Sequence, residues 1–265
     1  MTEQAVLIDA GNTNTALGVY RGDELVGHLR LSTDRRRTAD ELAASILPLF
    51  AHLGLDPAAT SAFLVASVVP PLKLSFELLA ASYFNAEALF VDAAMVAAAG
   101  MPIRYPNPAE IGADRVINAV AARARYGAPV VVVDFGTATN FDVVDGDGAY
   151  AGGILAPGLG ISAEALFAKA SRLYRVDLTR PDELIGTSTA SAMQSGIYYG
   201  YVGLVDGILK RLIDELPGLE TIVATGGLAG LIAGGSSYIR EVDPLLTLSG
   251  LKLVLDRHRA AGRRG

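Results

Sequence analysis

The chain has 265 residues, and its composition of 51% hydrophobic and 19% charged residues is that of a soluble globular protein. This length allows two compact domains or one large one. The net charge of −6 argues against a nucleic-acid-binding protein, because a broad basic surface is needed to offset phosphate repulsion. Two basic clusters, residues 35–37 and 257–264, are interpreted as solvated faces.

Cysteine is absent from the sequence, which excludes disulfides and a cysteine nucleophile and fits a reducing compartment. The histidines, His28, His52 and His258, lie far apart, so neither a zinc site nor a Ser-His-Asp mechanism is favoured. The N-terminus has no signal-peptide pattern, and no apolar run of about 18 residues indicates a membrane span. We therefore expect a cytoplasmic protein without nucleic-acid or membrane partners.

The first motif is a strand that runs into a polar turn, Val6-Leu-Ile-Asp9-Ala-Gly11-Asn12-Thr13-Asn14-Thr15, with a second short strand over residues 16–20. Further strands are expected over residues 24–31, 63–67 and 89–91. Helices are expected from the capping-box pattern at residues 38–41 to about residue 53, and from the Pro70-Pro71 stop to about residue 84. This succession predicts a mixed sheet flanked by helices, an α/β layer.

A proline-rich irregular segment, residues 100–111, leads to Gly112-Ala113-Asp114-Arg115 at the start of a helix that ends near residue 125. The second half then begins with four consecutive valines, residues 130–133, which indicate a strand buried on both faces. It repeats the first motif as Asp134-Phe-Gly136-Thr137-Ala-Thr139. Strands are expected over residues 149–155 and 221–225, and helices over residues 189–216, after Gly226-Gly227, and over 245–258.

The glycines of the long predicted helix recur at spacings of four, three and four residues and therefore share one face: Gly196, Gly200, Gly203 and Gly207. Each glycine costs a helix about 1 kcal/mol relative to alanine. We expect such a face to allow a close backbone approach, either by another helix or by a bound ligand.

The two Asp-Gly hairpins lie about half the chain apart. A tight glycine turn directs N–H groups toward an oxyanion, and Thr or Asn side chains add donors. Because an aspartate repels phosphate, each Asp implies a cation or its water shell between them. One such hairpin is typical of an ordinary β-turn, whereas two copies indicate a duplicated domain that binds a nucleotide across a cleft.

Four motifs together resemble the acetate and sugar kinase, actin and heat-shock chaperone superfamily, and within it the type III pantothenate kinases: Asp9-x-Gly-Asn-Thr, Gly112-Ala-Asp-Arg115, Asp134-x-Gly-Thr-Ala-Thr139 and Thr225-Gly-Gly227. The resemblance extends from residue 7 to about residue 251. It implies two duplicated ribonuclease-H-like domains, residues 1–127 and 128–265, each a mixed five-stranded sheet flanked by helices, with an interdomain cleft. Asn140 and Ser188 depart from the family pattern, in which Thr and Asn are common.

The resemblance implies a transferase that phosphorylates pantothenate to 4′-phosphopantothenate with ATP, the first step of coenzyme A biosynthesis. It implies magnesium, a monovalent cation (potassium or ammonium) and a homodimer with the substrate site at its interface. Asp114 is the implied general base; its residue type alone also suits a first-turn partner of the helix dipole. The implied pantothenate contacts are Tyr105, Gly112, Ala113, Asp114, Arg115 and, from the partner subunit, Thr189.

The same resemblance places ATP and its phosphates against Asp9, Ala10, Gly11, Asn12, Thr13, Asn14, Thr15, Ala16, Gly136, Thr137 and Thr139, with Gly226 and Gly227 beside the adenosine. Asp9 is implied to orient magnesium through water, and Asp134 to bind the monovalent cation. Plainer roles stay open for three positions: turn capping for Asp134, loop packing for Tyr105 and a helix N-cap for Thr189.

Two other functions stay open. One is a catalytically silent nucleotide-binding regulator or accessory protein of the same fold, and the other is a kinase for another small hydroxy acid. The intact phosphate motifs argue against the first, and the Gly112-Ala-Asp-Arg115 motif argues against the second.

Overall fold

The computed structural model describes residues 3–92, 95–96, 99–169 and 175–262. The chain divides into two compact units, the first formed by residues 1–101, 106–121 and 247–265 and the second by residues 102–105 and 122–246. The predicted domain division after residue 127 lies near the change of unit after residue 121. The segment from residue 247 onward groups with the first unit, whereas the predicted limits placed it in the second domain.

The first unit is built on a five-stranded mixed sheet in the order β3-β2-β1-β4-β5. Its strands are β1 (Gln4–Ala10), β2 (Asn14–Arg21), β3 (Glu24–Ser32), β4 (Thr60–Ser67) and β5 (Ala88–Phe90). The first three are antiparallel neighbours, and β4 and β5 run parallel to β1. The predicted mixed sheet is confirmed.

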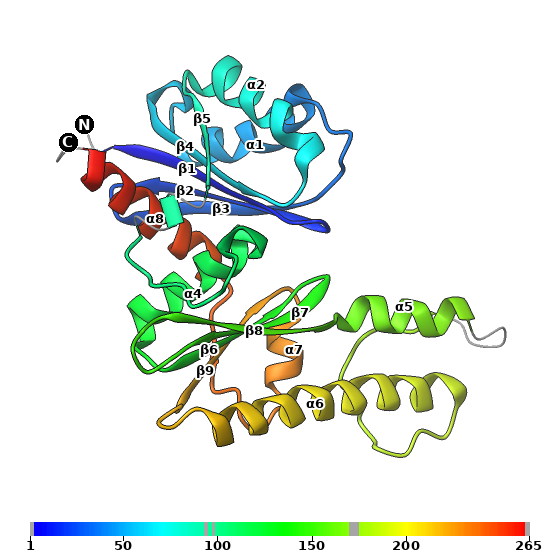
Figure 1. Ribbon diagram of the computed structural model, residues 1–265. Helices are drawn as coiled ribbons and strands as arrows, with labels where there is room; N and C mark the ends of the chain where they lie inside the picture. Colours follow the sequence, from blue (N-terminus) through cyan, green and yellow to red (C-terminus); the bar gives the residue numbers. More distant parts are fainter. Residues whose placement is uncertain (1–2, 93–94, 97–98, 170–174, 263–265) are drawn as a thin grey trace. The chain divides into compact units, whose positions relative to one another are not determined.

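Helices α1 (Ala39–Leu53) and α2 (Lys73–Phe84) cover one face of this sheet (Figure 1). Val6 and Ile8 of β1 pack there in one core with Phe50 and Phe76. The predicted capping box is confirmed, since the Thr38 side chain accepts from the N–H of Glu41 while the Glu41 side chain accepts from the N–H of Thr38. Short 3₁₀ turns lie at Pro57–Ala59, Pro70–Leu72 and Pro108–Glu110.

The last helix, α8 (Leu246–Gly262), belongs to the first unit because of what it packs against. The Leu248 side chain lies 3.1 Å from where a Cβ of Gly18 on β2 would be. Gly250 lies so close to α4 (Ala113–Tyr126) that a Cβ there would overlap the carbonyl oxygen of Ile117. The Thr247 hydroxyl donates to Asn118 Oδ1 (2.7 Å).

The second unit repeats the strand arrangement of the first. Its strands are β6 (Val130–Phe135), β7 (Ala138–Val144), β8 (Tyr150–Pro157), β9 (Thr221–Gly226) and β10 (Glu241–Val242). The order β10-β9-β6-β7-β8 matches that of the first sheet when β6 is equated with β1 and β9 with β4. The β6–β7–β8 neighbours are antiparallel and β6–β9–β10 are parallel, so the duplication is confirmed.

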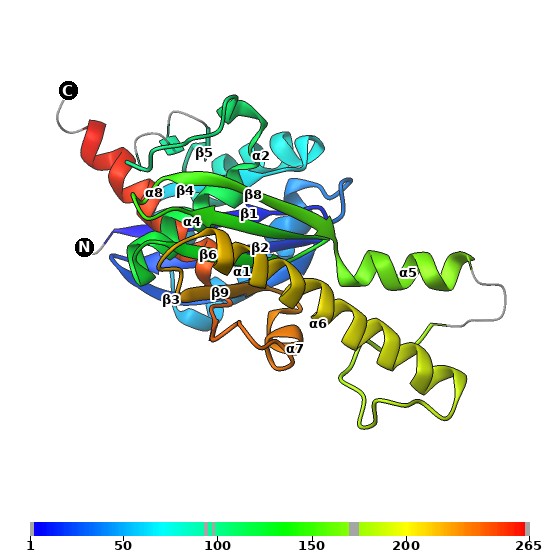
Figure 2. The same cartoon turned by 60° about the horizontal axis from the view of Figure 1, so that its bottom comes forward.

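Three helices complete this unit: α5 (Leu159–Lys169), α6 (Thr189–Glu215) and α7 (Ala229–Ala233). Tyr198, Val202 and Val205 of α6 pack against Val131 and Val133 of β6. The part of α6 nearest its N-terminus lies beside α5, beyond the end of β8 (Figures 1 and 2). The helix α5 and the two-residue strand β10 were not predicted from the sequence.

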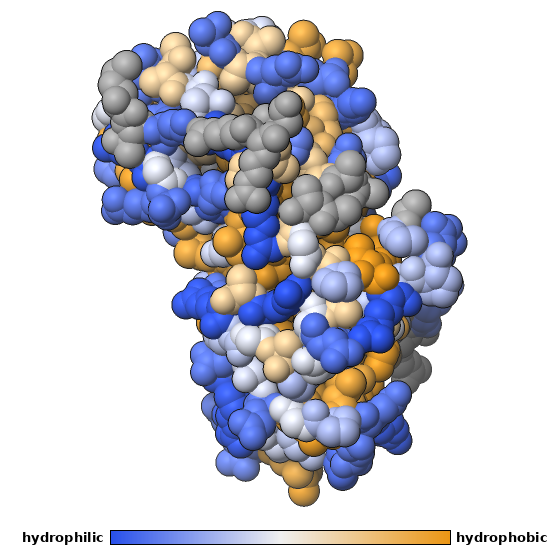
Figure 3. All heavy atoms as spheres, turned by 60° about the vertical axis from the view of Figure 1, so that its left-hand side comes forward, coloured by the Kyte–Doolittle hydropathy of each residue, from blue (hydrophilic) through white to orange (hydrophobic). Residues whose placement is uncertain are grey.

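None of the helices in the described part of the chain is long and apolar enough to cross a membrane. On the face drawn in Figure 3, hydrophilic residues are spread between smaller apolar areas.

Candidate active site

The first predicted phosphate loop is the turn between β1 and β2. The N–H of Gly11 donates to the carbonyl of Asn14 (3.0 Å), which closes the turn. Asn12, Thr13 and Asn14 are exposed at its tip, and Asp9 is half-buried at the end of β1. The tip therefore offers polar groups to a ligand from solvent. Ala10 and Thr15 are buried and Ala16 is half-buried, so they support the turn from below.

The end of β3 braces this loop. The Thr33 hydroxyl donates to the carbonyl of Gly11 (2.7 Å), and the Thr33 N–H donates to the carbonyl of Thr13 (2.9 Å). The Thr33 hydroxyl also lies 2.9 Å from that of Thr15, and Arg35 Nη2 donates to Asn12 Oδ1 (3.0 Å). Neither Thr33 nor Arg35 was among the residues predicted from the sequence, although both contact the predicted loop. They could have been found from the antiparallel pairing of β3 with β2, because this pairing brings the end of β3 back to the loop at the start of β2.

The second predicted phosphate loop is the turn between β6 and β7. The N–H of Gly136 donates to the carbonyl of Ala138 (3.1 Å), and the N–H of Gly158 donates to the carbonyl of Thr137 (3.2 Å). Gly136 and Thr137 are exposed. A Cβ at Gly158 would overlap the Thr137 carbonyl oxygen, so this position behind the loop requires glycine.

Asp134 stands at the centre of one row of side chains. It pairs directly with Asn140 on β7 and with Thr225 on β9, so the three side chains share one face of the sheet. A Cβ at Gly226 would lie 2.5 Å from Asp134 Oδ1, and Gly226 has a φ of +92°. Gly226 therefore leaves room for the carboxylate. Asn140 Oδ1 is buried and has no hydrogen-bond partner among the residues described.

Thr139 faces the opposite side of the sheet, toward α6. It is fully buried, and its hydroxyl is hydrogen-bonded to that of Tyr201. The Tyr201 hydroxyl also donates to the carbonyl of Pro157 (3.1 Å), so with its single proton used there it accepts from Thr139. Thr139 thus supports the loop from behind, and its contact with ATP stays a prediction.

Asp114 lies in the first turn of α4. Its Oδ1 accepts from the N–H of Arg115 (2.9 Å), and a Cβ at Gly112 would lie 2.5 Å from that same oxygen. Glycine at residue 112 therefore leaves room for the Asp114 carboxylate. Burial raises the pKa of the Asp114 carboxyl, while the hydrogen bond and charge of Arg115 oppose that change. Ala113 and Arg115 are half-buried beside it.

Tyr105 belongs to a short segment that docks on the second unit. The N–H of Arg104 donates to the carbonyl of Tyr150 (2.9 Å), and the N–H of Tyr150 donates to that of Pro102 (2.8 Å). Arg104 also forms ion pairs with Asp145 (2.6 Å) and Asp147. The Tyr105 ring lies 3.8 Å from where a Cβ of Gly152 would be, so the segment fixes this half-buried ring against β8.

The start of α6 differs in detail from its prediction. The N-cap is Ser188, whose side chain accepts from the N–H of Ser191, and Thr189 is the first helical residue. The Thr189 side chain is exposed. On the same helix, a Cβ at Gly196, Gly200 or Gly203 would meet no atom of the described chain within 4 Å, whereas one at Gly207 would lie 3.6 Å from Arg211 Nη1.

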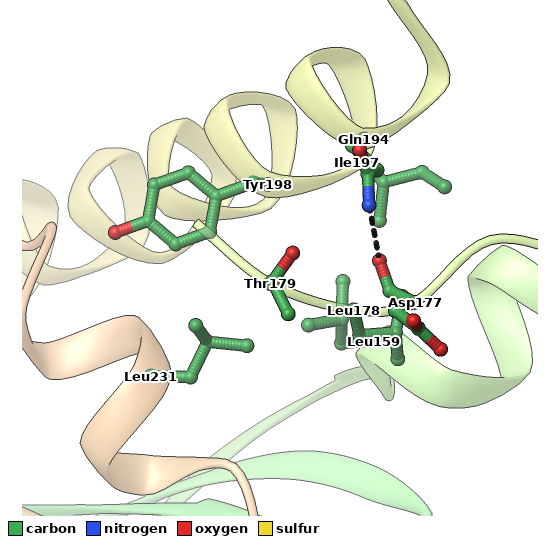
Figure 4. Close-up of a pocket in the computed structure, with 8 residues that line it drawn as sticks. All are labelled: Leu159, Asp177, Leu178, Thr179, Gln194, Ile197, Tyr198 and Leu231. Carbon is green, nitrogen blue, oxygen red and sulfur yellow. Dashed lines mark hydrogen bonds between the residues drawn. The ribbon is translucent and has the colours of Figure 1, made fainter. Parts of the chain in front are cut away.

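A pocket in the second unit lies between α6, residues 177–179, Leu159 of α5 and Leu231 of α7 (Figure 4). Gln194 Nε2 donates to the carbonyl of Asp177 across it (3.2 Å). It contains none of the predicted site residues. The described residues also contain no group of three or more His, Cys, Asp or Glu that could hold a metal ion.

Comparison with known proteins agrees with these motifs. The family model described as type III pantothenate kinase matches residues 5–211. The type III pantothenate kinase of Koribacter versatilis (strain Ellin345) is 47% identical over 269 residues, 98% of this chain and 97% of that protein. That of Anaeromyxobacter sp. (strain Fw109-5) is 52% identical over 252 residues, 95% of this chain and 98% of that protein.

Among solved structures, the activator of the 2-hydroxyisocaproyl-CoA dehydratase from Clostridium difficile, determined with bound ADPNP, is similar with a TM-score of 0.58. The alignment covers 98% of this chain and 97% of that chain at 12% identity. At this identity the similarity shows a shared fold.

Proposed function

Because the chain belongs to the type III pantothenate kinase family, we propose that it phosphorylates the primary hydroxyl of pantothenate with Asp114 as general base. The chain is an enzyme, a phosphotransferase that uses ATP in coenzyme A biosynthesis. The product is 4′-phosphopantothenate.

The observation that carries this proposal is the environment of Asp114. A general base is most effective when its pKa is close to the working pH, and burial moves the pKa of this carboxyl in that direction. Phosphoryl transfer has a loose transition state, so the base mainly orients the attacking hydroxyl and accepts its proton. We assign Arg115, with its planar fork of donors, to the carboxylate of pantothenate.

We assign the two glycine turns, at residues 9–16 and 134–139, to the phosphates of ATP. Asn12, Thr13 and Thr137 lie at exposed positions of these turns, and their side chains would supply donors beside backbone N–H groups. Asp9 would hold magnesium through water, and magnesium would neutralise charge that develops on the phosphates. Use of ATP and the absence of cysteine fit a cytoplasmic location.

The residues around Asp134 fit a potassium or ammonium ion. Asp134 supplies one negative charge, and the unpartnered Oδ1 of Asn140 on the same face supplies a neutral oxygen. Hard cations take oxygen ligands of these kinds. Such an ion would offset repulsion between Asp134 and the phosphates.

We also propose a homodimer in which the partner subunit's Thr189 contributes to the pantothenate site. The open glycine face of α6 supports it, because helical glycines without an internal contact are explained by the close approach of a second backbone. Leu204 on the same helix and Leu155 on β8 are large apolar residues exposed in the single chain.

The test is ADP release by the purified protein with ATP, magnesium and potassium, measured with and without pantothenate. We expect pantothenate-dependent release that falls by about 10²- to 10⁴-fold in Asp114→Asn, while ATP binding persists. Glu110→Gln is the matched control, since it removes one exposed carboxylate just before α4 and should keep activity. If pantothenate does not stimulate ADP release, the assignment of pantothenate as substrate is contradicted. If Asp114→Asn loses ATP binding as strongly as it loses ADP release, the assignment of Asp114 as general base is contradicted.

A further inference from the structure

We propose that Arg35 is a positioning residue that orients the side-chain amide of Asn12, so that Asn12 presents its NH₂ group to ATP. The inference rests on the proposed function, because it takes the first loop to be a phosphate site. It gives a role to one residue of the 35–37 basic cluster, which the sequence alone indicated to be a solvated face.

The contact that carries the proposal is the hydrogen bond from Arg35 Nη2 to Asn12 Oδ1 (3.0 Å). A guanidinium group only donates hydrogen bonds, so the atom it meets must be the amide oxygen and not the nitrogen. The NH₂ group of Asn12 therefore points away from Arg35. Since Asn12 is exposed at the tip of the loop, these two donors are left for a ligand.

This orientation matters because the two ends of an asparagine amide have opposite effects on an anion. The NH₂ end donates to a phosphate oxygen, whereas the carbonyl end repels it. Without Arg35 the amide can turn over and present its oxygen. With Arg35 in place, the amide already has the orientation that presents NH₂ to the ligand. ATP binding therefore does not lose free energy to order this side chain.

The backbone of the loop does not depend on Arg35. Thr33 holds the carbonyls of Gly11 and Thr13 and contacts the hydroxyl of Thr15. The turn is also closed by its own Gly11–Asn14 hydrogen bond. Removal of the Arg35 side chain should therefore leave the turn in place and change only the Asn12 amide and the local charge.

The neighbouring Arg36 provides a matched control. Its side chain is 90% exposed, and it pairs with Asp34 (3.5 Å). Its backbone N–H also donates to Asp34 Oδ1 (2.9 Å), so both of these contacts of Arg36 are with a residue outside the first loop. Arg35→Ala and Arg36→Ala remove the same charge from adjacent positions, so a difference between them reports the contact with Asn12.

The first measurement is the affinity for a non-hydrolysable ATP analogue with magnesium, by calorimetry, together with steady-state kinetics and melting temperatures. We expect Arg35→Ala to weaken binding about fivefold to tenfold, because binding then has to order the Asn12 side chain that Arg35 holds in the wild type. The KM for ATP should rise by the same factor, while kcat and the KM for pantothenate stay within about twofold. Arg36→Ala should bind as the wild type does.

A double-mutant cycle decides whether Arg35 acts through Asn12. We expect Asn12→Ala to weaken binding, and we expect Arg35→Ala to add little in the Asn12→Ala background. Additive losses, or equal losses in Arg35→Ala and Arg36→Ala, would show a general charge effect and overturn the inference. A wild-type protein that binds no ATP analogue would instead overturn the proposed function itself, so the two failures are distinguishable.

Discussion

At the scale of single residues, Asp114 combines a chemical advantage with a thermodynamic disadvantage. Burial disfavours its ionised form and so raises its pKa above the ordinary value of 3.8. A carboxylate with a raised pKa holds a proton more strongly and is a better base. The same burial means that the folded protein is less stable whenever the carboxyl is ionised. This is the pattern expected where function and stability conflict.

The pH dependence of both properties follows from the sign of this shift. The folded state binds the proton more tightly than the unfolded state, so the destabilisation is absent at low pH and develops as pH rises through the folded pKa. We expect Asp114→Asn to raise the melting temperature at pH 7 and to have a smaller effect toward pH 4. In the wild type, the acid limb of kcat/KM should lie above pH 3.8. A variant less stable than the wild type at pH 7 would contradict this account.

Asn140 has a similar double character. A buried amide oxygen without a partner costs about 1–3 kcal/mol. Without potassium, we expect Asn140→Val to raise the free energy of unfolding by about 1 kcal/mol. With potassium, we expect the affinity for the ion, measured from its stabilising effect, to fall about tenfold. The measurement is thermal unfolding in potassium chloride and in choline chloride at equal ionic strength.

Two further variants separate ligation from packing at this position. Asn140→Thr has the shape of Val but keeps an oxygen, so it should retain much of the potassium response. Asp134→Asn removes the charge and should abolish the response. If Asn140→Val keeps the wild-type response to potassium, the Asn140 oxygen is not a ligand.

At the scale of secondary-structure elements, local patterns were sufficient for most of the fold. The valine run of β6 and the capping box of α1 each act within a few residues, so sequence alone located them. The helix α5 lacked such a signal, because its apolar residues do not form one buried stripe: Ile161 is 43% exposed and Leu166 40%. The two residues of β10 are a strand only through their pairing with β9.

The candidate site was predictable to the same depth. Both glycine turns followed from sequence motifs, and Asp114 was singled out through the family resemblance, where its role as base stays a prediction; the support around them did not follow from the sequence. Glycine at residue 226 was expected to leave room for adenosine. The structure adds a second reason for glycine there, since a Cβ at residue 226 would overlap the carboxylate of Asp134. The segment ending in Tyr105 is fixed by Tyr150 and by the aspartates of the turn between β7 and β8. Arg104 and Asp147 are 43 positions apart in the sequence, so only the folded chain shows that they pair.

At the scale of the whole molecule, duplication extends from the sheets to the support of the loops. The residue just after β3, Thr33, donates its N–H to the carbonyl of Thr13. The residue just after β8, Gly158, does the same to the carbonyl of Thr137. The copies differ in the side chain: Thr33 adds a hydroxyl to its loop, whereas any side chain at Gly158 would overlap its loop. One backbone design thus supports two different turns.

The proposed homodimer makes the last prediction. Each helical glycine costs about 1 kcal/mol, and those at residues 196, 200 and 203 make no internal contact that would explain them. We expect the wild type to sediment as a dimer and Gly203→Glu, which buries a charge against the second helix, to sediment as a monomer. Because Thr189 is assigned to the partner's pantothenate site, kcat/KM for pantothenate should fall about tenfold or more, while affinity for the ATP analogue remains.

The matched control is Ala81→Glu at an exposed position of α2, a helix that carries none of the assigned site residues. It adds the same charge away from α6, so it should leave both the dimer and the kinetics unchanged. Equal melting temperatures at low protein concentration would show that both variants fold. A Gly203→Glu protein that remains dimeric would place the interface elsewhere. A monomeric Gly203→Glu protein with wild-type kinetics would show that the partner subunit contributes nothing to the pantothenate site.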